Sequence, residues 1–190
     1  MIRIGDLKIS VFEFIVMIIV LYNQIMYIPQ SSKYKSVVVE LSASLSFMIF
    51  CNGVLSCING TEFFGSYYIN YVFTVIYFIL NGLVPLLWFK YMYIFYDTSP
   101  KKFTSYITTI PYLLYLLLIF INSFTDLFFY IDSNNRYQRG DGFWLIVVLS
   151  MVYIIASVVV IVLAITRNRG FRSEGKHILL GMSLVALGII

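Results

Sequence analysis

Long apolar stretches, separated by short polar segments, divide the chain into five complete units and the start of a sixth. The stretches are Val11 to Ile28, Val37 to Ile58, Ile69 to Phe95, Tyr106 to Ile131, Phe143 to Thr166, and Ile178 onward. A bilayer core of ~30 Å is spanned by about 20 mainly apolar residues in a helix. Strands of a membrane barrel would alternate apolar and polar residues, and Tyr112 to Ile121 does not alternate. The pattern therefore predicts an all-α, polytopic transmembrane helix bundle.

The sixth stretch is predicted to be incomplete. Residues 178–190 would rise only about 20 Å as a helix, which is less than the membrane core. We therefore expect the native polypeptide to continue through the rest of this helix and into a seventh.

The composition agrees with a membrane protein. Apolar residues make up 61% of the chain and charged residues 12%, whereas a soluble domain carries about 25% charge. The formal net charge is +4, but the basic residues are spread over short loops instead of along one face. We therefore expect a lipid bilayer as partner and no nucleic acid.

The basic residues also predict the orientation, because Lys and Arg near a span favour the cytoplasmic side. One side of the predicted bundle collects Lys33, Lys35, Lys90, Lys101, Lys102, Arg167, Arg169, Arg172 and Lys176. The other side has Arg3, Lys8, Arg136 and Arg139. We expect a multi-pass protein of the cell membrane with its N-terminus outside.

The sequence gives no support for catalysis within these residues. It contains no Gly-rich phosphate loop, no nucleophile elbow and no His-Glu-x-x-His pattern. Cys51 and Cys57 lie six positions apart in one apolar stretch, a spacing that fits no zinc-ligand pair. We expect no metal and no cofactor.

Charged residues inside a membrane need a partner, a wet cavity or a function. Glu40 and Lys90 each fall about one turn from the predicted cytoplasmic end of their stretch, where lysine can extend to the interface. They are candidates for an ion pair at the inner face, or for interfacial charges without chemistry.

A second group of polar residues falls in the outer half of the predicted bundle. The ligand-binding candidates are Glu13, Asn70, Thr74, Asn122 and Asp126. In the third stretch, Asn70, Thr74, Tyr77 and Asn81 share one helical face. Such a face either joins helices through hydrogen bonds or lines a pocket that binds a small ligand. Both interpretations are open at this point.

A family resemblance is carried by Ile121 to Asp132 and by the run Asn135-Arg136-Tyr137-Gln138-Arg139-Gly140 that follows. This segment resembles part of the seven-helix N-terminal sensor region of bacterial histidine kinases and GGDEF-type diguanylate cyclases. In that resemblance Tyr137, Arg139 and Gly140 form a structural turn before the fifth helix. It implies that residues 1–190 are an incomplete transmembrane sensor domain. A cytoplasmic output domain, either kinase or cyclase, would follow it and form a homodimer.

A secondary transporter of a small solute is the alternative function. It would be expected to show an inverted repeat with interrupted helices at corresponding positions. Only the third stretch has such an interruption, at Asn81-Gly82 and Pro85, and no repeat is evident. The sequence therefore favours a sensor over a transporter.

Overall fold

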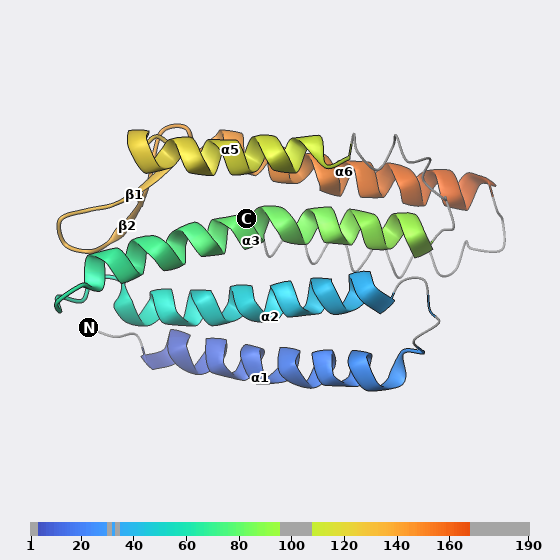
Figure 1. Ribbon diagram of the computed structural model, residues 1–190, viewed down its shortest axis with the longest axis horizontal. Coiled ribbons are helices and arrows are strands. Elements are labelled where there is room, and N and C mark those ends of the chain that lie inside the picture. The colour runs from blue at the N-terminus through green and yellow to red at the C-terminus, as the bar shows by residue number, and fades with distance from the viewer. Residues whose placement is uncertain (1–3, 30–31, 33–34, 96–107, 168–190) are drawn as a thin grey trace.

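The computed structural model describes residues 4–29, 32, 35–95 and 108–167. Five long helices and one short hairpin make up these residues (Figure 1). The helices are α1 (Ile4–Tyr27), α2 (Lys35–Ile58), α3 (Ser66–Phe95), α5 (Ile110–Thr125) and α6 (Phe143–Arg167). The hairpin is formed by β1 (Phe129–Ile131) and β2 (Tyr137–Arg139). The predicted sixth stretch, from Ile178, lies outside the described residues.

Helix α3 occupies the centre of the bundle. It packs against α2 on one side and against α5 and α6 on the other, while α1 packs on the far side of α2 (Figure 1). Half of the residues in the most apolar stretch of α3 are buried inside the protein, compared with about a quarter of those in the corresponding stretch of α6. Side chains of α3 therefore form much of the interior.

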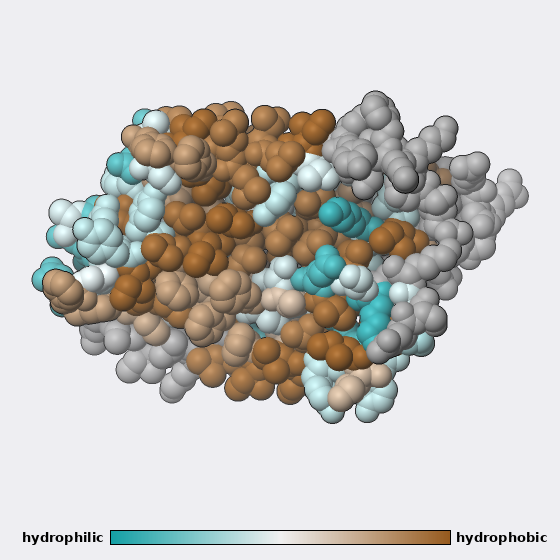
Figure 2. Space-filling view, in the orientation of Figure 1, coloured by the Kyte–Doolittle hydropathy of each residue, from teal (hydrophilic) through white to brown (hydrophobic). Residues whose placement is uncertain are grey.

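Three of the helices are long and apolar enough to cross a membrane: α2, α3 and the part of α6 from Phe143 to Leu163. Val11–Tyr27 and Ile110–Thr125 are shorter apolar helices. Figure 2 shows hydrophobic residues over the middle of the visible face and paler or hydrophilic residues at the hairpin end. The predicted helical class is confirmed, and a hydrocarbon environment accounts for the exposed apolar side chains.

The predicted fourth helix is wrong in its last part. Helix α5 ends at Thr125, and Asp126 adopts a left-handed conformation (φ 52°) whose N–H donates to the Asn122 carbonyl at 3.1 Å. A left-handed residue at this point ends a helix and turns the chain away. The apolar residues after this turn do not extend the span: Phe128 precedes β1, Phe129 begins it, and both are buried in a cluster with Phe78 of α3.

Two glycines allow the close packing that places the hairpin and α5. A Cβ at Gly82 would lie 2.6 Å from the ring of Tyr115, whose hydroxyl donates to the Phe78 carbonyl at 2.8 Å. A Cβ at Gly140 would overlap the Leu127 carbonyl oxygen. Hence α5 sits directly on α3, and the chain leaving β2 sits directly on the chain entering β1.

Candidate functional site

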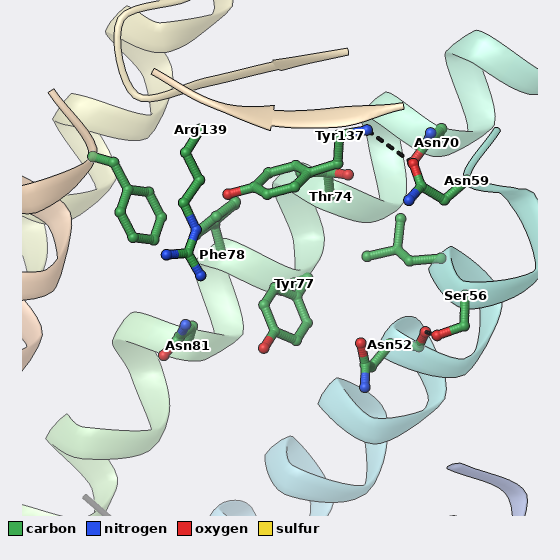
Figure 3. A pocket seen from close by; sticks show the side chains of 12 residues that line it. Asn52, Ser56, Asn59, Asn70, Thr74, Tyr77, Phe78, Asn81, Tyr137 and Arg139 are labelled. Atoms are coloured by element: carbon green, nitrogen blue, oxygen red, sulfur yellow. Dashed lines mark hydrogen bonds between the residues drawn. The ribbon is translucent and has the colours of Figure 1, made fainter. Parts of the chain in front are cut away.

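A cavity of about 350 Å³ lies between α2, α3 and the hairpin, at the end of the bundle where the hairpin packs (Figure 3). Most of its lining side chains are polar or aromatic. The lining residues are Asn52, Leu55, Ser56, Asn59, Asn70, Thr74, Tyr77, Phe78, Asn81, Tyr137, Arg139 and Phe143. Its volume is at the lower end of the range of ~300–1,000 Å³ that is usual for small-molecule sites.

Asn135, in the turn of the hairpin, fixes the hairpin over this cavity. It is buried in a left-handed conformation (φ 55°), which asparagine tolerates better than most residues. Its side-chain Nδ2 donates to the carbonyls of Ile58 at 3.0 Å and Thr61 at 2.8 Å. Its own carbonyl accepts from the Gly60 N–H at 2.7 Å and from Asn70 Nδ2 at 3.0 Å. One residue thus connects the α2–α3 loop, α3 and the hairpin.

Two further contacts define the hairpin. Asn59 Oδ1 accepts a hydrogen bond from the Tyr137 N–H at 2.8 Å, so the α2–α3 loop pairs with the free edge of β2 (Figure 3). Asp132 Oδ1 accepts from the backbone N–H groups of Arg136 and Asn134, both at 2.9 Å. The Arg136 bond, together with that from Gln138 to Oδ2, lowers the pKa of the Asp132 carboxyl below its usual value.

Helix α3 contributes one wall of the cavity. Asn70, Thr74, Tyr77 and Asn81 follow the helical repeat and face the same side, as the sequence predicts. Asn70 is 0% exposed and Thr74 2% exposed. Neither Asn70 Oδ1 nor Thr74 Oγ1 has a hydrogen-bond partner within the described residues. Buried polar atoms are nearly always paired, so these two atoms mark a place for a polar ligand or water.

Strand β2 contributes the opposite wall. The guanidinium carbon of Arg139 lies 4.7 Å from the centroid of the Phe143 ring, in a cation–π contact. Tyr137 lies between Arg139 and Asn59 (Figure 3). Burial raises the pKa of Tyr137 to about 12, so its hydroxyl is neutral at physiological pH and can donate a hydrogen bond. The wall therefore offers a cation and a phenol.

The structure brings together only two of the five predicted ligand-binding residues, Asn70 and Thr74. Glu13 is exposed on α1, and Asp126 is exposed at the end of α5. Asn122 is buried but already engaged: its Oδ1 accepts from the N–H of Phe128 at 2.7 Å and of Phe129 at 3.1 Å, and its Nδ2 donates to the Phe129 carbonyl at 2.9 Å. Asn122 therefore holds the start of β1 in place.

The structure does not join the other predicted pair, Glu40 and Lys90, in an ion pair. Glu40 is exposed and accepts a hydrogen bond from the Ser36 hydroxyl at 2.7 Å, one turn earlier on α2. Lys90 is half-buried on α3. Both remain candidates for interfacial charges.

The residues predicted to form a turn have two different roles in the structure. Tyr137 and Arg139 belong to β2 and line the cavity, while Gly140 provides the close approach to Leu127. Sequence reasoning missed Asn135 and the contributions of Asn52 and Asn59. The one available signal was that Asn59 and Asn135 follow the ends of predicted stretches, where an amide can bond to backbone groups that helices leave free.

The chain also matches a known family. The family described as the N-terminal 7TM region of histidine kinase matches residues 9–190. No curated protein and no solved structure shows significant similarity to the chain. The match covers α1 from its second turn, all the other helices and the hairpin.

Proposed function

Because the chain belongs to the family of N-terminal 7TM regions of histidine kinases, we propose that it is the sensory input module of a membrane-bound signalling protein. In this role the segment itself is non-catalytic. It detects a signal at the membrane and changes the activity of a cytoplasmic output domain that follows it in the chain. The cavity beside Asn70 and Thr74 is the proposed sensing site.

A histidine kinase is the output domain that the family membership favours over a diguanylate cyclase. The proposed partner is a second copy of the same protein, joined through that output domain. Binding of a small ligand would then alter kinase activity in the dimer.

The two unpaired buried atoms, Asn70 Oδ1 and Thr74 Oγ1, are the observation that carries the proposal. Leaving a buried donor or acceptor unpaired costs about 1–3 kcal/mol. Interhelical hydrogen bonding does not explain these atoms, since they bond to no helix among the described residues. A ligand that pairs with them would recover this free energy on binding.

The charge distribution supports an outer position for the cavity. The hairpin and the α2–α3 loop lie at one end of the bundle (Figure 1), and the sequence pattern assigns fewer basic residues to that side than to the other. A side poor in Lys and Arg faces away from the cytoplasm. In this orientation the N-terminus is outside and the ligand enters from outside.

Helix α3 is the proposed route from the cavity to the cytoplasm. A ligand can shift a conformational equilibrium only if it binds two arrangements with different affinity. Pro85 lies inside α3 and has no N–H, so the Asn81 carbonyl lacks its usual intrahelical partner. Asn81 also lines the cavity. The turn of α3 that lacks this hydrogen bond therefore borders the proposed ligand site.

A cavity-filling substitution tests this function in the full-length protein. We expect Ser56→Phe, which places a ring in the cavity, to change autophosphorylation in membrane vesicles by about tenfold, which corresponds to ~1.4 kcal/mol. Val72→Phe on the exposed face of α3 is the matched control and should leave autophosphorylation unchanged. Normal kinase activity in both variants, at normal membrane abundance, would contradict the proposal.

Reporter fusions test the orientation separately. A reporter that is active only in the cytoplasm should be inactive after Ser133 and active after Arg169. Activity after Ser133 would place the hairpin, and the cavity with it, on the inner side.

A further inference from the structure

We propose that the cavity binds a small aromatic acid, with its negative group at Arg139 and a hydrogen-bond donor at Asn70 and Thr74. This inference rests on the proposed sensory function for its physiological meaning and names the chemical class of the signal. Charge, hydrogen bonding and shape each support it.

The charge of the cavity selects an anion. Among the described residues that line the cavity, Arg139 is the one with a formal charge, and none is an aspartate or glutamate. Within the described part of the chain no ion pair involves Arg139. Its side chain interacts with the Phe143 ring and with Tyr137. A guanidinium carries five N–H donors in a planar fork that fits a carboxylate. A cationic ligand would be repelled from the same point.

The polar end of the α3 wall selects a donor. Asn70 uses its Nδ2 to bond Asn135, so the atom it leaves for a ligand is the acceptor Oδ1. The hydroxyl of Thr74 is one helical turn further along the same face and is also unpaired. A hydroxyl group of the ligand would satisfy both residues by donating to Asn70 Oδ1 and accepting from the Thr74 hydroxyl, whereas an acyl chain would leave both unpaired.

The space between these two ends selects a flat ring. Tyr77, Phe78 and Tyr137 line the region between Arg139 and Asn70 (Figure 3). Aromatic rings favour stacked or edge-to-face contacts with another ring. The volume of about 350 Å³ suits a molecule of one ring with short substituents and is too small for a folded peptide.

Arg139 also lies where an anion can reach it. The residue is exposed and lines the cavity, and its side chain extends from β2 toward Asn81 (Figure 3). Long-range attraction by an exposed cation speeds the arrival of an anion. The negative group therefore meets Arg139 while the ring enters the space below.

The test uses the full-length protein in nanodiscs of phosphatidylcholine, with para-hydroxybenzoate as the probe. We expect this acid at millimolar concentration to raise the midpoint of thermal unfolding, while para-hydroxybenzamide and tyramine, which lack the negative charge, do not. Arg139→Gln should weaken the apparent affinity by about tenfold or more, because a charge-assisted hydrogen-bond pair is lost. Arg136→Gln, on the same hairpin but outside the cavity, is the matched control and should bind as the parent does.

Three results would overturn the inference. They are the absence of stabilisation by the acid, equal stabilisation by acid and amide, or unchanged binding in Arg139→Gln. Stabilisation by inorganic phosphate alone, or by phosphatidylglycerol in the nanodisc but not by the acid, would also overturn it and identify a phosphate group as the ligand.

Together, the binding and kinase experiments distinguish an error in the ligand class from an error in the sensory function. If the acid binds through Arg139 but neither it nor Ser56→Phe changes autophosphorylation, the ligand class stands and the sensory function is wrong. If no acid binds but Ser56→Phe changes autophosphorylation, the sensory function stands and the ligand class is wrong.

Discussion

The side-chain Nδ2 of Asn70 lies 3.0 Å from both the carbonyl oxygen and the side-chain Oδ1 of Asn135, a residue 65 positions later in the chain. This contact joins the central helix to the turn of the hairpin. It also sets the orientation of the Asn70 amide, since the nitrogen faces Asn135 while the oxygen has no hydrogen-bond partner among the described residues. The same bond therefore fastens the hairpin and prepares the proposed ligand site.

Replacing Asn135 should loosen the hairpin. Asn135→Ala removes the donors to the Ile58 and Thr61 carbonyls and leaves Asn70 with fewer acceptors, which we expect to cost about 2 kcal/mol or more of unfolding free energy. Asn135→Gly, which keeps the left-handed backbone without strain, separates the loss of hydrogen bonds from backbone strain. Thermal unfolding in nanodiscs measures both variants against Asn134→Ala on the exposed turn. A midpoint equal to that of Asn134→Ala would show that these bonds contribute nothing.

Removing the unpaired hydroxyl of Thr74 should stabilise the ligand-free protein. Thr74→Val keeps the shape of the side chain and removes a buried polar atom that has no partner, so we expect a gain of about 1 kcal/mol. Thr61→Val is the matched opposite, because the Thr61 hydroxyl donates to the Ile58 carbonyl at 2.6 Å and its loss should destabilise. The two melting midpoints should move in opposite directions. A drop for Thr74→Val would mean that its hydroxyl is paired in the ligand-free state.

Enlarging Gly82 should separate α3 from α5. Gly82→Ala places a methyl group against the Tyr115 ring, and overpacking of this kind costs about 1–3 kcal/mol. Tyr115→Leu reduces the bulk on the facing helix. In a double-mutant cycle we expect the cost of Gly82→Ala to be smaller in the Tyr115→Leu background. Strict additivity of the two changes would show that the helices do not press on each other here.

Acid should weaken the turn of the hairpin through Asp132. The folded-state pKa of its carboxyl is lowered, chiefly by the Arg136 N–H, so the carboxylate stabilises the turn above the ordinary aspartate pKa of about 3.9. This contribution is lost as the pH falls through the lowered value. We expect any advantage in melting midpoint of the parent over Asp132→Asn to shrink on that descent. A difference that stays constant with pH would assign it to packing instead of charge.

The helices were predictable because the thickness and apolar character of a bilayer core set the length and the apolar composition of a helix that crosses it. The ends at Ile58 and Phe95 and the start at Phe143 agree with the sequence prediction. The hairpin was not predictable in the same way. Phe128 and Phe129 are apolar enough to continue a membrane helix, but the left-handed Asp126 ends α5 before them and Phe129 begins β1.

The candidate site was predictable on α3 and not elsewhere. The repeat from Asn70 to Asn81 places its polar side chains on one face, and the structure directs that face into the cavity. Asn122, like Asn70, is an asparagine inside a predicted apolar stretch. Its partners Phe128 and Phe129 were expected to be helical, with their N–H groups already bonded within the helix. Which buried amide is free for a ligand depends on how neighbouring backbone groups are paired, and a sequence pattern does not show this pairing.

A change of bend at Pro85 would move the segment of α3 that follows it, which ends at Phe95, as one rigid arm. Phe95 is ten positions after Pro85, so this segment is roughly 15 Å long at 1.5 Å per residue. A rotation of about 10° at the proline would therefore displace the far end by roughly 2.6 Å, a shift larger than the ≈ 1–2 Å helix translations that accompany switching at subunit interfaces. Asn81, one helical turn before Pro85, is the residue through which a bound molecule would contact this part of α3.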